Sequence, residues 1–290
     1  MPVIVDTIAL VGTGLIGGSF ALALKQAGAV SEVLGLGRNP AHLNVARELG
    51  LIDRAVEWED AGRADCILLA LPVGETETVL HQLSPHLKPG AIVTDAGSTK
   101  ATVVAAARAT LGARVADFVP GHPIAGSEQS GPGAARADLY RGKRVVLTPQ
   151  TDTRADAVTT VRHLWEAAGA QVEILDAVQH DRIFAAVSHL PHLAAFALVD
   201  ELAQRPDSET FFRFAASGFR DFTRIAGSSP EMWRDIALAN RDALLVELDA
   251  YLGALQTLRT ALSADEAATL TKIFSRAREA RENWINKQDA

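Results

Sequence analysis

A histidine and a serine stand in two glycine-containing segments, each of which directly follows a predicted strand. His122 lies in GHPIAGSE at residues 121–128, and Ser98 lies in DAGSTK at residues 95–100. A loop histidine can act as a general acid or base near neutral pH, although a surface histidine without a chemical role is an equally good interpretation of this residue alone. The hydroxyl of Ser98 could bind a ligand at the carboxyl end of a strand, but a serine that begins a predicted helix is more often its N-cap.

Basic side chains recur in the second half of the chain. His189 and His192, in SHLPH, are three residues apart and share one face of a predicted helix. Two histidines without a cluster of carboxylates or cysteines are too few for a metal site, so we expect no metal. Arg220 and Arg224 are four residues apart and could clamp a carboxylate or phosphate. Salt bridges to neighbouring aspartates are the plainer alternative for these two arginines.

A glycine-rich turn follows the first predicted strand. Gly12, Gly14 and Gly17 form the pattern GxGxxG between that strand and a helical stretch. In this setting the first glycine permits a tight turn, the second lets the backbone approach a pyrophosphate, and the third lets the helix pack on the strand. We expect the start of the helix, including Leu15 and Ile16, to bind the phosphates of a dinucleotide through its free N–H groups.

The residues after the second predicted strand bear on the choice of cofactor. NAD sites usually carry Asp or Glu there to bind the ribose, whereas this chain has Gly37, Arg38 and Asn39 and no carboxylate. A guanidinium can bind a 2′-phosphate that a carboxylate would repel. We therefore expect Arg38 and Asn39 to contact the cofactor and NADP to be favoured over NAD. If Arg38 only stacks on the adenine, NAD remains possible.

These residues must be positioned by the strands and helices that alternate over the first 176 residues. Amphipathic helical stretches, at residues 19–27, 40–49 and 99–111, separate short apolar runs that we interpret as strands. Most of the runs lack polar alternation, as expected for parallel strands covered on both faces. The predicted fold class is therefore α/β, a Rossmann-type doubly wound parallel sheet. The predicted strands are residues 7–11, 32–36, 65–71, 91–94, 115–119, 144–148 and 171–175.

The strand pattern ends near residue 176, and only helical patterns follow. We expect Pro191 to kink the first of these helices, and Ser263 with Glu266 to form a capping box for the last. The sequence thus predicts a Rossmann domain at residues 1–176 and an all-α domain at residues 177–290, whose apolar stripes could be buried in a homodimer. The predicted helices are residues 177–204, 209–216, 230–262 and 264–286.

The composition excludes several classes of protein. The 290 residues are 48% hydrophobic and 22% charged, with a net charge of −7, which is an ordinary globular composition. The negative net charge argues against a nucleic-acid partner. The sequence contains no run of about 18 uninterrupted apolar residues, so we predict no membrane span. The single cysteine, Cys66, cannot form an internal disulfide, and the first residues lack a positively charged signal region. We therefore expect a cytoplasmic location.

Five segments, taken in order, make the chain resemble a known enzyme family. GTGLIGGS, DAGSTK, GHPIAGSEQSG, SHLPH and GFRDFTRIA with MWRD are similar to the motifs of the prephenate/arogenate (cyclohexadienyl) dehydrogenases of tyrosine biosynthesis. The resemblance covers residues 6–286, and the last four motifs are specific as a set. It implies a Rossmann domain joined to a helical domain that dimerises, an NAD(P) cofactor, and prephenate or arogenate as the small-molecule substrate.

The resemblance also implies roles for individual residues. His122 would be the catalytic histidine bonded to the ring hydroxyl of the substrate. Ser98 would bond to the same hydroxyl and help to place the nicotinamide. His189 would contact the side chain of the substrate, and Arg224 would bind a substrate carboxylate.

Two further residues match the family, and one position departs from it. Glu128 matches an acidic residue near the mouth of the site, and Trp233 matches a tryptophan beside the pocket. The departure is Gly37, where NAD-dependent members carry an acidic residue. Prephenate and arogenate differ in a keto against an amino side chain, and the sequence leaves that choice open.

Two other functions are compatible with a Rossmann domain followed by helices. A 3-hydroxyacid or imine reductase would be expected to use a lysine of the helical domain, but residues 177–262 contain no lysine. A regulator that senses dinucleotides without catalysis would have no need of His122, Ser98 and Arg224 together. The dehydrogenase is therefore the preferred prediction.

Overall fold

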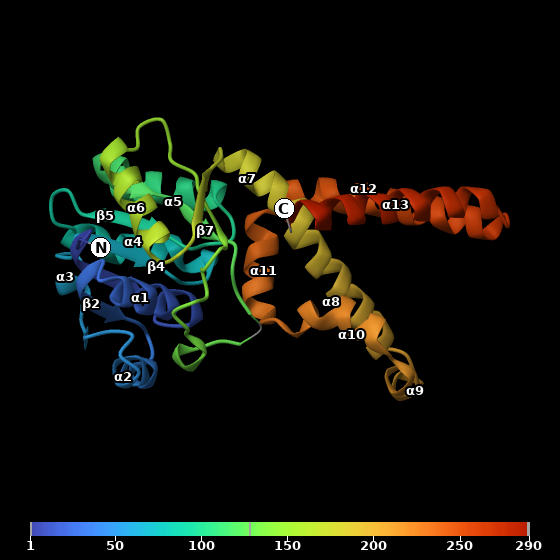
Figure 1. Ribbon diagram of the computed structural model, residues 1–290, viewed down its shortest axis with the longest axis horizontal. Coiled ribbons are helices and arrows are strands. Elements are labelled where there is room, and N and C mark those ends of the chain that lie inside the picture. The colour runs from blue at the N-terminus through green and yellow to red at the C-terminus, as the bar shows by residue number, and fades with distance from the viewer. Residues whose placement is uncertain (1, 128, 289–290) are drawn as a thin grey trace. The chain divides into compact units, whose positions relative to one another are not determined.

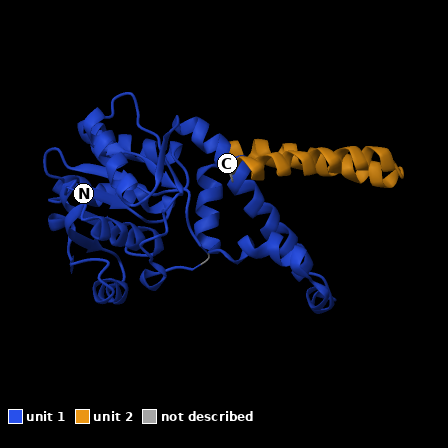
Figure 2. Ribbon diagram, in the orientation of Figure 1, with its two compact units in different colours: residues 1–241 blue, residues 242–290 orange. Residues whose placement is uncertain are grey.

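The computed structural model describes residues 2–127 and 129–288, and its internal contacts divide the chain into two compact units. The first unit is residues 1–241 and the second is residues 242–290 (Figure 2). All the candidate site residues that the structure describes belong to the first unit. The expected domain boundary at residue 176 lies within that unit.

A six-stranded sheet organises the first unit, with the strand order β3-β2-β1-β4-β5-β6 (Figure 1). Every neighbouring pair is parallel, so the predicted doubly wound α/β fold is confirmed. The strand order reverses between β1 and β4, and ligands of such sheets bind outside the carboxyl ends of the strands at that point. The strands are β1 (Val5–Val11), β2 (Val30–Leu36), β3 (Arg54–Ala55), β4 (Cys66–Leu69), β5 (Ile92–Asp95) and β6 (Phe118–Val119).

Helices cover both faces of this sheet. Alternate side chains of β1 point to opposite faces: Ile8 and Leu10 join the core that includes α1 and α6, whereas Ala9 and Val11 join the core that includes α4 and α5. The helices are α1 (Leu15–Ala27), α2 (Pro40–Glu48), α3 (Trp58–Ala61), α4 (Thr76–Leu83), α5 (Ala101–Leu111) and α6 (Ala155–Ala167). Short 3₁₀ turns are η1 (Val73–Glu75), η2 (Ser84–His86), η3 (Gly112–Asp117) and η4 (Pro132–Ala134).

A second, three-stranded sheet contains β7 (Gly121–Pro123), β8 (Arg144–Leu147) and β9 (Gln171–Ile174). The predicted strands at residues 144–148 and 171–175 therefore exist, but they do not extend the large sheet. β7 pairs antiparallel with β8, and His122 is opposite Val146. The expectation that His122 lies in a loop is wrong, because its backbone is part of a strand.

Helices follow from residue 177 to the end of the first unit. The helix expected over residues 177–204 is present, but it passes through a π-helical turn, η5 (Ala185–His189). Pro191 stands in the first turn of the next helix, where its missing N–H costs least. The elements are α7 (Ala177–Phe184), α8 (Leu190–Ala203), α9 (Ser208–Phe214), α10 (Ser217–Thr223), the 3₁₀ turn η6 (Arg224–Gly227) and α11 (Pro230–Ala239).

One helical stretch among the described residues, Ala177–Ala203, is long and apolar enough to cross a membrane by length and composition alone. A single stretch of this kind is weak evidence for a span. This one carries His180 and Asp181, which are buried and polar.

The second unit consists of two long helices, α12 (Arg241–Ser263) and α13 (Ala267–Gln288). The single helix expected over residues 230–262 is interrupted at Asn240, the C-cap of α11. The expected capping box is wrong, because Ser263 is the last residue of α12 and its hydroxyl donates to the main-chain oxygen of Arg259.

Candidate functional site

The glycine-rich turn after β1 has the geometry that a dinucleotide motif requires. Gly12 has a φ of +99°, and a Cβ added there would lie 2.2 Å from the main-chain oxygen of Ala70. A Cβ at Gly17 would lie 2.1 Å from the oxygen of Gly12, so glycine alone allows α1 to start this close to the turn. A Cβ at Gly14 would meet no atom closer than 3.9 Å, so this glycine leaves open space in front of the helix.

The amino end of α1 can bind an anion. Gly14 is the N-cap, no side chain caps the helix, and no acidic residue stands in its first turn. The N–H groups of Leu15, Ile16 and Gly17 have no acceptor within the helix and can donate to a phosphate. The residues present therefore fit the pyrophosphate of a dinucleotide.

Arg38 and Asn39 follow β2 and differ in what their side chains do. Arg38 is exposed, and its Nη1 lies 2.9 Å from Oε1 of Glu75 in η1. The side chain of Asn39 accepts a hydrogen bond from Ala41 N and caps α2. An exposed ion pair contributes about 0–1 kcal/mol, so a phosphate could displace Glu75 from Arg38 at little cost.

The backbone of His122 is held by a buried ion pair. Lys100 and Asp95 are both buried and form a salt bridge. Lys100 Nζ also donates to the main-chain oxygen of Gly121 at 2.7 Å, and Asp95 Oδ1 accepts from Gly121 N at 3.0 Å. The DAGSTK segment thus fixes the strand residue immediately before His122.

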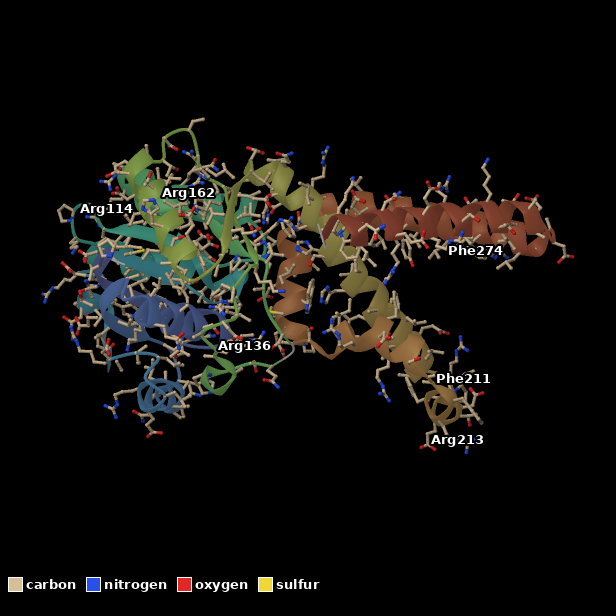
Figure 3. The ribbon with its side chains drawn as sticks, in the orientation of Figure 1. Arg114, Arg136, Arg162, Phe211, Arg213 and Phe274 are labelled. Atoms are coloured by element: carbon tan, nitrogen blue, oxygen red, sulfur yellow. The ribbon has the colours of Figure 1, made fainter. Side chains whose placement is uncertain are left out.

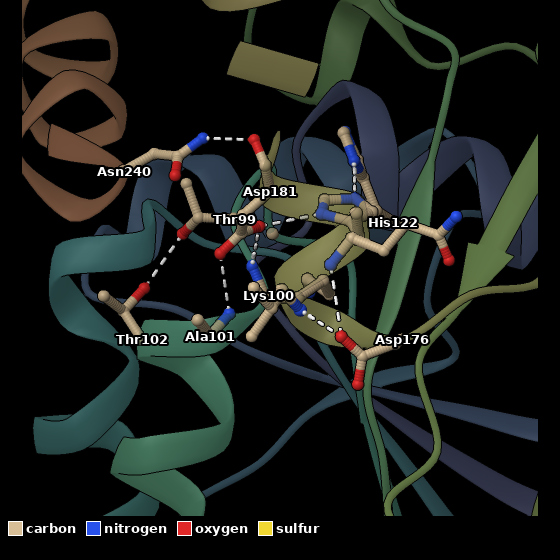
Figure 4. Close-up of polar contacts among 12 residues, drawn as sticks. Thr99, Lys100, Ala101, Thr102, His122, Asp176, Asp181 and Asn240 are labelled. Carbon is tan, nitrogen blue, oxygen red and sulfur yellow. Dashed lines mark hydrogen bonds and ion pairs between the residues drawn. The ribbon is translucent and has the colours of Figure 1, made fainter. Parts of the chain in front are cut away.

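The imidazole of His122 is joined to two further side chains from α7. Its Nδ1 lies 2.8 Å from Nε2 of His180, and Nδ1 of His180 lies 2.8 Å from Oδ1 of Asp181. The Asp181 carboxylate also accepts from the main-chain N–H groups of Lys100 and Ala101, at 2.7 and 2.8 Å (Figure 4). A line of three polar side chains therefore runs from the start of α5 to His122, and two of them, His180 and Asp181, are buried.

Burial keeps these histidines neutral. The pKa of His122 lies well below its usual value, chiefly because the ring is buried and secondarily because His180, Lys100 and His189 are close. Burial also lowers the pKa of His180, although the hydrogen bond to Asp181 opposes that shift. A neutral imidazole has one lone pair, so His122 can accept a proton at ordinary pH.

Two buried N–H groups beside this line have no acceptor among the described residues. The side-chain nitrogen of Asn240 donates to the main-chain oxygen of Asp181 at 2.8 Å and lies 3.0 Å from Nδ1 of His189. Nδ1 of His189 is then the acceptor, which places its hydrogen on Nε2. Nε2 of His189 and Nε1 of Trp233 are both buried without a partner in residues 2–127 and 129–288. An oxygen-rich ligand would satisfy both donors.

Arg224 and His192 complete this cluster. The ring of His192 stacks on Trp233, with centroids 3.5 Å apart, and the ring of His189 meets the edge of Trp233 at 6.0 Å. The positive charge of Arg224 contributes to lowering the pKa of His192, so the guanidinium lies near that ring. The plainer alternative for Arg220 and Arg224 was a set of salt bridges to neighbouring aspartates. One of these aspartates, Asp235, pairs with Arg234.

Ser98 is half-buried on the loop between β5 and α5. The expectation that it caps the helix is wrong: α5 starts at Ala101, and Asp181 caps it from α7. Glu128 lies outside the described residues.

Sequence reasoning missed five residues that build this site. Asp95 and Lys100 were considered only as part of the DAGSTK motif. An acid at the end of a strand and a lysine just before a helix could have predicted their ion pair. His180 and Asp181 resembled ordinary polar residues of a helix, and no local pattern shows that both are buried. Asn240 had no signal, because the helical pattern continues through it.

Residues 2–127 and 129–288 contain no group of three or more His, Cys, Asp or Glu side chains placed to hold a metal ion. Nδ1 of His189 and Nδ1 of His192 are engaged with Asn240 and with the main-chain oxygen of Ser188, respectively.

Two family models match successive parts of the chain. "Prephenate dehydrogenase, nucleotide-binding domain" matches residues 20–174, and "Prephenate dehydrogenase, dimerization domain" matches residues 176–276. The prephenate dehydrogenase of Bacillus subtilis is 37% identical over 98% of this chain and 77% of the relative. The cyclohexadienyl dehydrogenase of Zymomonas mobilis is 36% identical over 94% of both chains.

Solved structures of enzymes with these names are similar to this chain over nearly its whole length. Prephenate dehydrogenase from Aquifex aeolicus, in complex with hydroxyphenyl propionate and NAD⁺, superposes with a TM-score of 0.90 at 36% identity and covers 96% of this chain and 98% of its own. The arogenate dehydrogenase of Synechocystis superposes with a TM-score of 0.80 at 31% identity, over 96% of this chain and 99% of its own.

Proposed function

Because this chain belongs to the prephenate dehydrogenase family of NAD(P)-dependent oxidoreductases, we propose that it oxidatively decarboxylates prephenate to 4-hydroxyphenylpyruvate, a step of L-tyrosine biosynthesis. One observation carries the proposal beyond the family. A neutral, half-buried His122 lies in the same unit as two buried N–H donors without acceptors, those of His189 and Trp233. A proton acceptor beside donors for oxygen atoms suits an anionic substrate that carries a hydroxyl group.

The reaction needs a base that takes the hydroxyl proton of the substrate while the hydride leaves. Prephenate carries a hydroxyl at C4 and a carboxylate at C1 of a cyclohexadiene ring. Hydride leaves C4, carbon dioxide leaves C1 with its bonding electrons passing into the ring, and the ring becomes aromatic. The hydroxyl gains carbonyl character as hydride leaves, so a base that draws its proton lowers the barrier. The proton returns to the phenol oxygen, and no net proton is released.

His122 is the base in this proposal, and other side chains bind the substrate. The lone pair of His122 accepts the hydroxyl proton, and Ser98 bonds to the same hydroxyl. The donors of His189 and Trp233 bind oxygens of the substrate side chain, while Arg224 binds a carboxylate. Holding the anion in one orientation lowers the entropic part of the barrier. Glu128, expected near the mouth, is included on the family resemblance alone.

The dinucleotide binds at the turn of Gly12, Gly14 and Gly17, with its pyrophosphate on the N–H groups of Leu15 and Ile16. When bound, the nicotinamide accepts the hydride. We propose that NADP is favoured over NAD, because Arg38 can exchange its exposed contact with Glu75 for a 2′-phosphate. Asn39 shapes this part of the site by capping α2.

Arogenate is the alternative substrate, since relatives in this family are named for it. It replaces the keto group of prephenate with an ammonium, which donates hydrogen bonds and accepts none. Both substrates offer a side-chain carboxylate to the two donors without acceptors, on His189 and Trp233, but only prephenate offers a keto oxygen as well. Prephenate is therefore the preferred substrate.

A homodimer is the proposed assembly, supported by the match to a dimerisation domain. Helices α9 and α10 expose Phe211, Phe212, Phe214 and Phe222, with 39%, 39%, 75% and 47% of their surfaces accessible. Phe211 and Arg213 are labelled on α9 in Figure 3. A second copy would cover this apolar surface. A monomeric mass by light scattering at micromolar concentration would contradict the assembly.

Three further expectations belong with this proposal. We place the domain boundary at residue 176, where the two family models meet, and the enzyme in the cytoplasm with no nucleic-acid or membrane partner. Cys66 is compatible with a reducing compartment, because burial raises the pKa of its thiol to about 12 and leaves it unreactive.

A steady-state matrix tests the function directly. Formation of reduced cofactor would be measured for prephenate and for arogenate, each with NAD⁺ and with NADP⁺. The proposal expects the highest kcat/KM for prephenate with NADP⁺. Turnover of neither substrate would contradict the function, and a higher kcat/KM with arogenate would make the alternative substrate correct.

A further inference from the structure

We propose that His180 and Asp181 act as positioning residues that fix the tautomer of His122, so that its Nε2 carries the lone pair offered to the substrate hydroxyl. The inference deepens the proposed function and rests on His122 being the base. It assigns a task to two buried residues that the sequence did not single out.

The direction of each hydrogen bond follows from the Asp181 carboxylate. Its Oδ1 accepts from Lys100 N and its Oδ2 from Ala101 N. An ionised carboxylate that already receives two N–H groups can only accept again, so Nδ1 of His180 must carry the hydrogen in the 2.8 Å contact with Oδ1. The neutral ring of His180 then has its lone pair on Nε2.

The tautomer of His180 then determines the tautomer of His122. Nε2 of His180 is an acceptor, so Nδ1 of His122 must donate across the 2.8 Å contact between them. A neutral imidazole with its hydrogen on Nδ1 has its lone pair on Nε2. Nε2 is the ring nitrogen of His122 that remains for the substrate. Without a fixed acceptor at His180, either tautomer could form, and one of them presents N–H in place of a lone pair.

The surroundings hold the line in place. Both histidine rings pack on Phe184, with centroids 4.8 Å from His122 and 4.4 Å from His180. Asn240 binds the main-chain oxygen of Asp181 from the end of α11 (Figure 4). His180 itself is fully buried, so water cannot replace its contacts.

Two variants at one position separate the hydrogen bond from the packing. His180→Phe keeps an aromatic ring against Phe184 but removes the acceptor for Nδ1 of His122. His180→Gln places an amide oxygen near the position of Nε2 and restores an acceptor. We expect kcat with prephenate to fall about 10–100-fold in His180→Phe, as for partners that orient a metal-bound histidine, and to recover in large part in His180→Gln. KM for prephenate should change little in both variants, because His180 does not contact substrate.

A double-mutant cycle tests whether His180 acts through His122. In a His122→Asn background the His180→Phe change should have no further effect on kcat, because the group that it positions is absent. A structural role for His180 would lower kcat by a similar factor in both backgrounds, and that outcome would overturn the inference. Thermal unfolding of every variant shows which of them are folded.

Nitrogen-15 NMR of histidine-labelled enzyme gives a readout that needs no turnover. The wild-type resonances of His122, assigned by their loss in His122→Asn, should show hydrogen on Nδ1 and a bare Nε2. In His180→Phe the two tautomers should be mixed. Hydrogen on Nε2 of His122 in the wild-type protein would overturn the inference even if prephenate is turned over. Failure of all turnover with the expected tautomer intact would instead contradict the proposed function.

Discussion

The carboxylate of Glu75 accepts a hydrogen bond from the guanidinium of Arg38 at 2.9 Å, so the cation expected to select the cofactor is already paired with an acid. Glu75 belongs to η1, and η1 packs on α11, the helix of Trp233. A Cβ at Gly74 would lie 3.1 Å from Oδ2 of Asp235 in that helix. The acid beside Arg38 therefore stands where the nucleotide-binding fold meets a helix of the proposed substrate site.

The cofactor preference should respond to both members of this pair. Arg38→Ala should raise KM for NADP⁺ about 10–150-fold with little change for NAD⁺, because one charge-assisted contact contributes about 1.5–3 kcal/mol. Glu75→Gln should lower KM for NADP⁺ by removing a competing anion. Both are measured as initial rates over a range of cofactor concentrations. Wild-type preference for NAD⁺ would show that Arg38 does not select NADP.

His122→Asn should lower kcat about 10²–10⁴-fold while KM for prephenate changes little, because the base acts in the transition state. In the wild-type enzyme the rate should need neutral His122. Since the pKa of this residue lies well below 6.5, the acidic limb of kcat/KM against pH should also lie below 6.5. A near-normal kcat in His122→Asn, or a limb at or above pH 6.5, would contradict this assignment.

Arg224→Ala should have a different kinetic signature. A carboxylate contact made in both the ground and transition states contributes to binding, so KM should rise about 10–150-fold with kcat largely retained. Arg220→Ala, one helical turn earlier, is the matched control that removes an equal charge. An unchanged KM in Arg224→Ala, or equal effects of the two variants, would leave Arg224 with a structural role.

The buried ion pair under β7 should matter for stability as well as activity. Lys100→Met leaves Asp95 buried without its cation, and breaking such a pair costs about 3–5 kcal/mol. Urea unfolding would measure the loss. The double variant Lys100→Met with Asp95→Asn should be less destabilised than the sum of the single variants, and additivity would show that the two side chains are not coupled.

Stability should decrease on mild acidification. Burial lowers the pKa of His189 to about 4, whereas the unfolded chain takes up that proton near 6.5. The unfolded state therefore binds more protons between these values, so stability is full above pH 6.5 and is lost progressively as pH falls towards 4. At pH 5 the loss from this residue is on the order of 2 kcal/mol. Urea midpoints at pH 7 and pH 5 measure it, and His189→Phe should reduce the difference.

Local chemistry was predictable, and long-range pairing was not. The glycine motif is a short pattern between Gly12 and Gly17, so it alone indicated the strand, the turn and the helix, although the close neighbour of Gly12 is the distant Ala70. His122 was expected in a loop because its strand partner, Val146, lies far along the chain and no local pattern marks a three-residue strand. The contacts from His122 through His180 to Asp181 could not be predicted for the same reason, because these residues come together only when α7 packs against the start of α5.

Helix boundaries failed where tertiary contacts replace local signals. Asn240 interrupts the helical pattern without a proline or glycine, and its side chain is bound to Asp181 and His189 instead. Ser98 looked like an N-cap, but the cap of α5 is supplied by Asp181, 81 residues away from Lys100. Propensity is a weak guide at such positions, because a distant buried partner determines the conformation.

The π-helical turn at Ala185–His189 determines the directions in which the side chains of α7 and α8 point relative to one another. His180 and His189 are nine residues apart. In an uninterrupted α-helix such residues point in about opposite directions, since each residue turns the helix by about 100°. A π turn accommodates roughly one additional residue, which rotates everything after it by about 100° relative to what comes before. His180 can therefore reach His122 while His189 reaches Asn240. Conversion of the π turn to α-helix without loss of a residue would swing His189, His192 and the rest of α8 out of phase with α7.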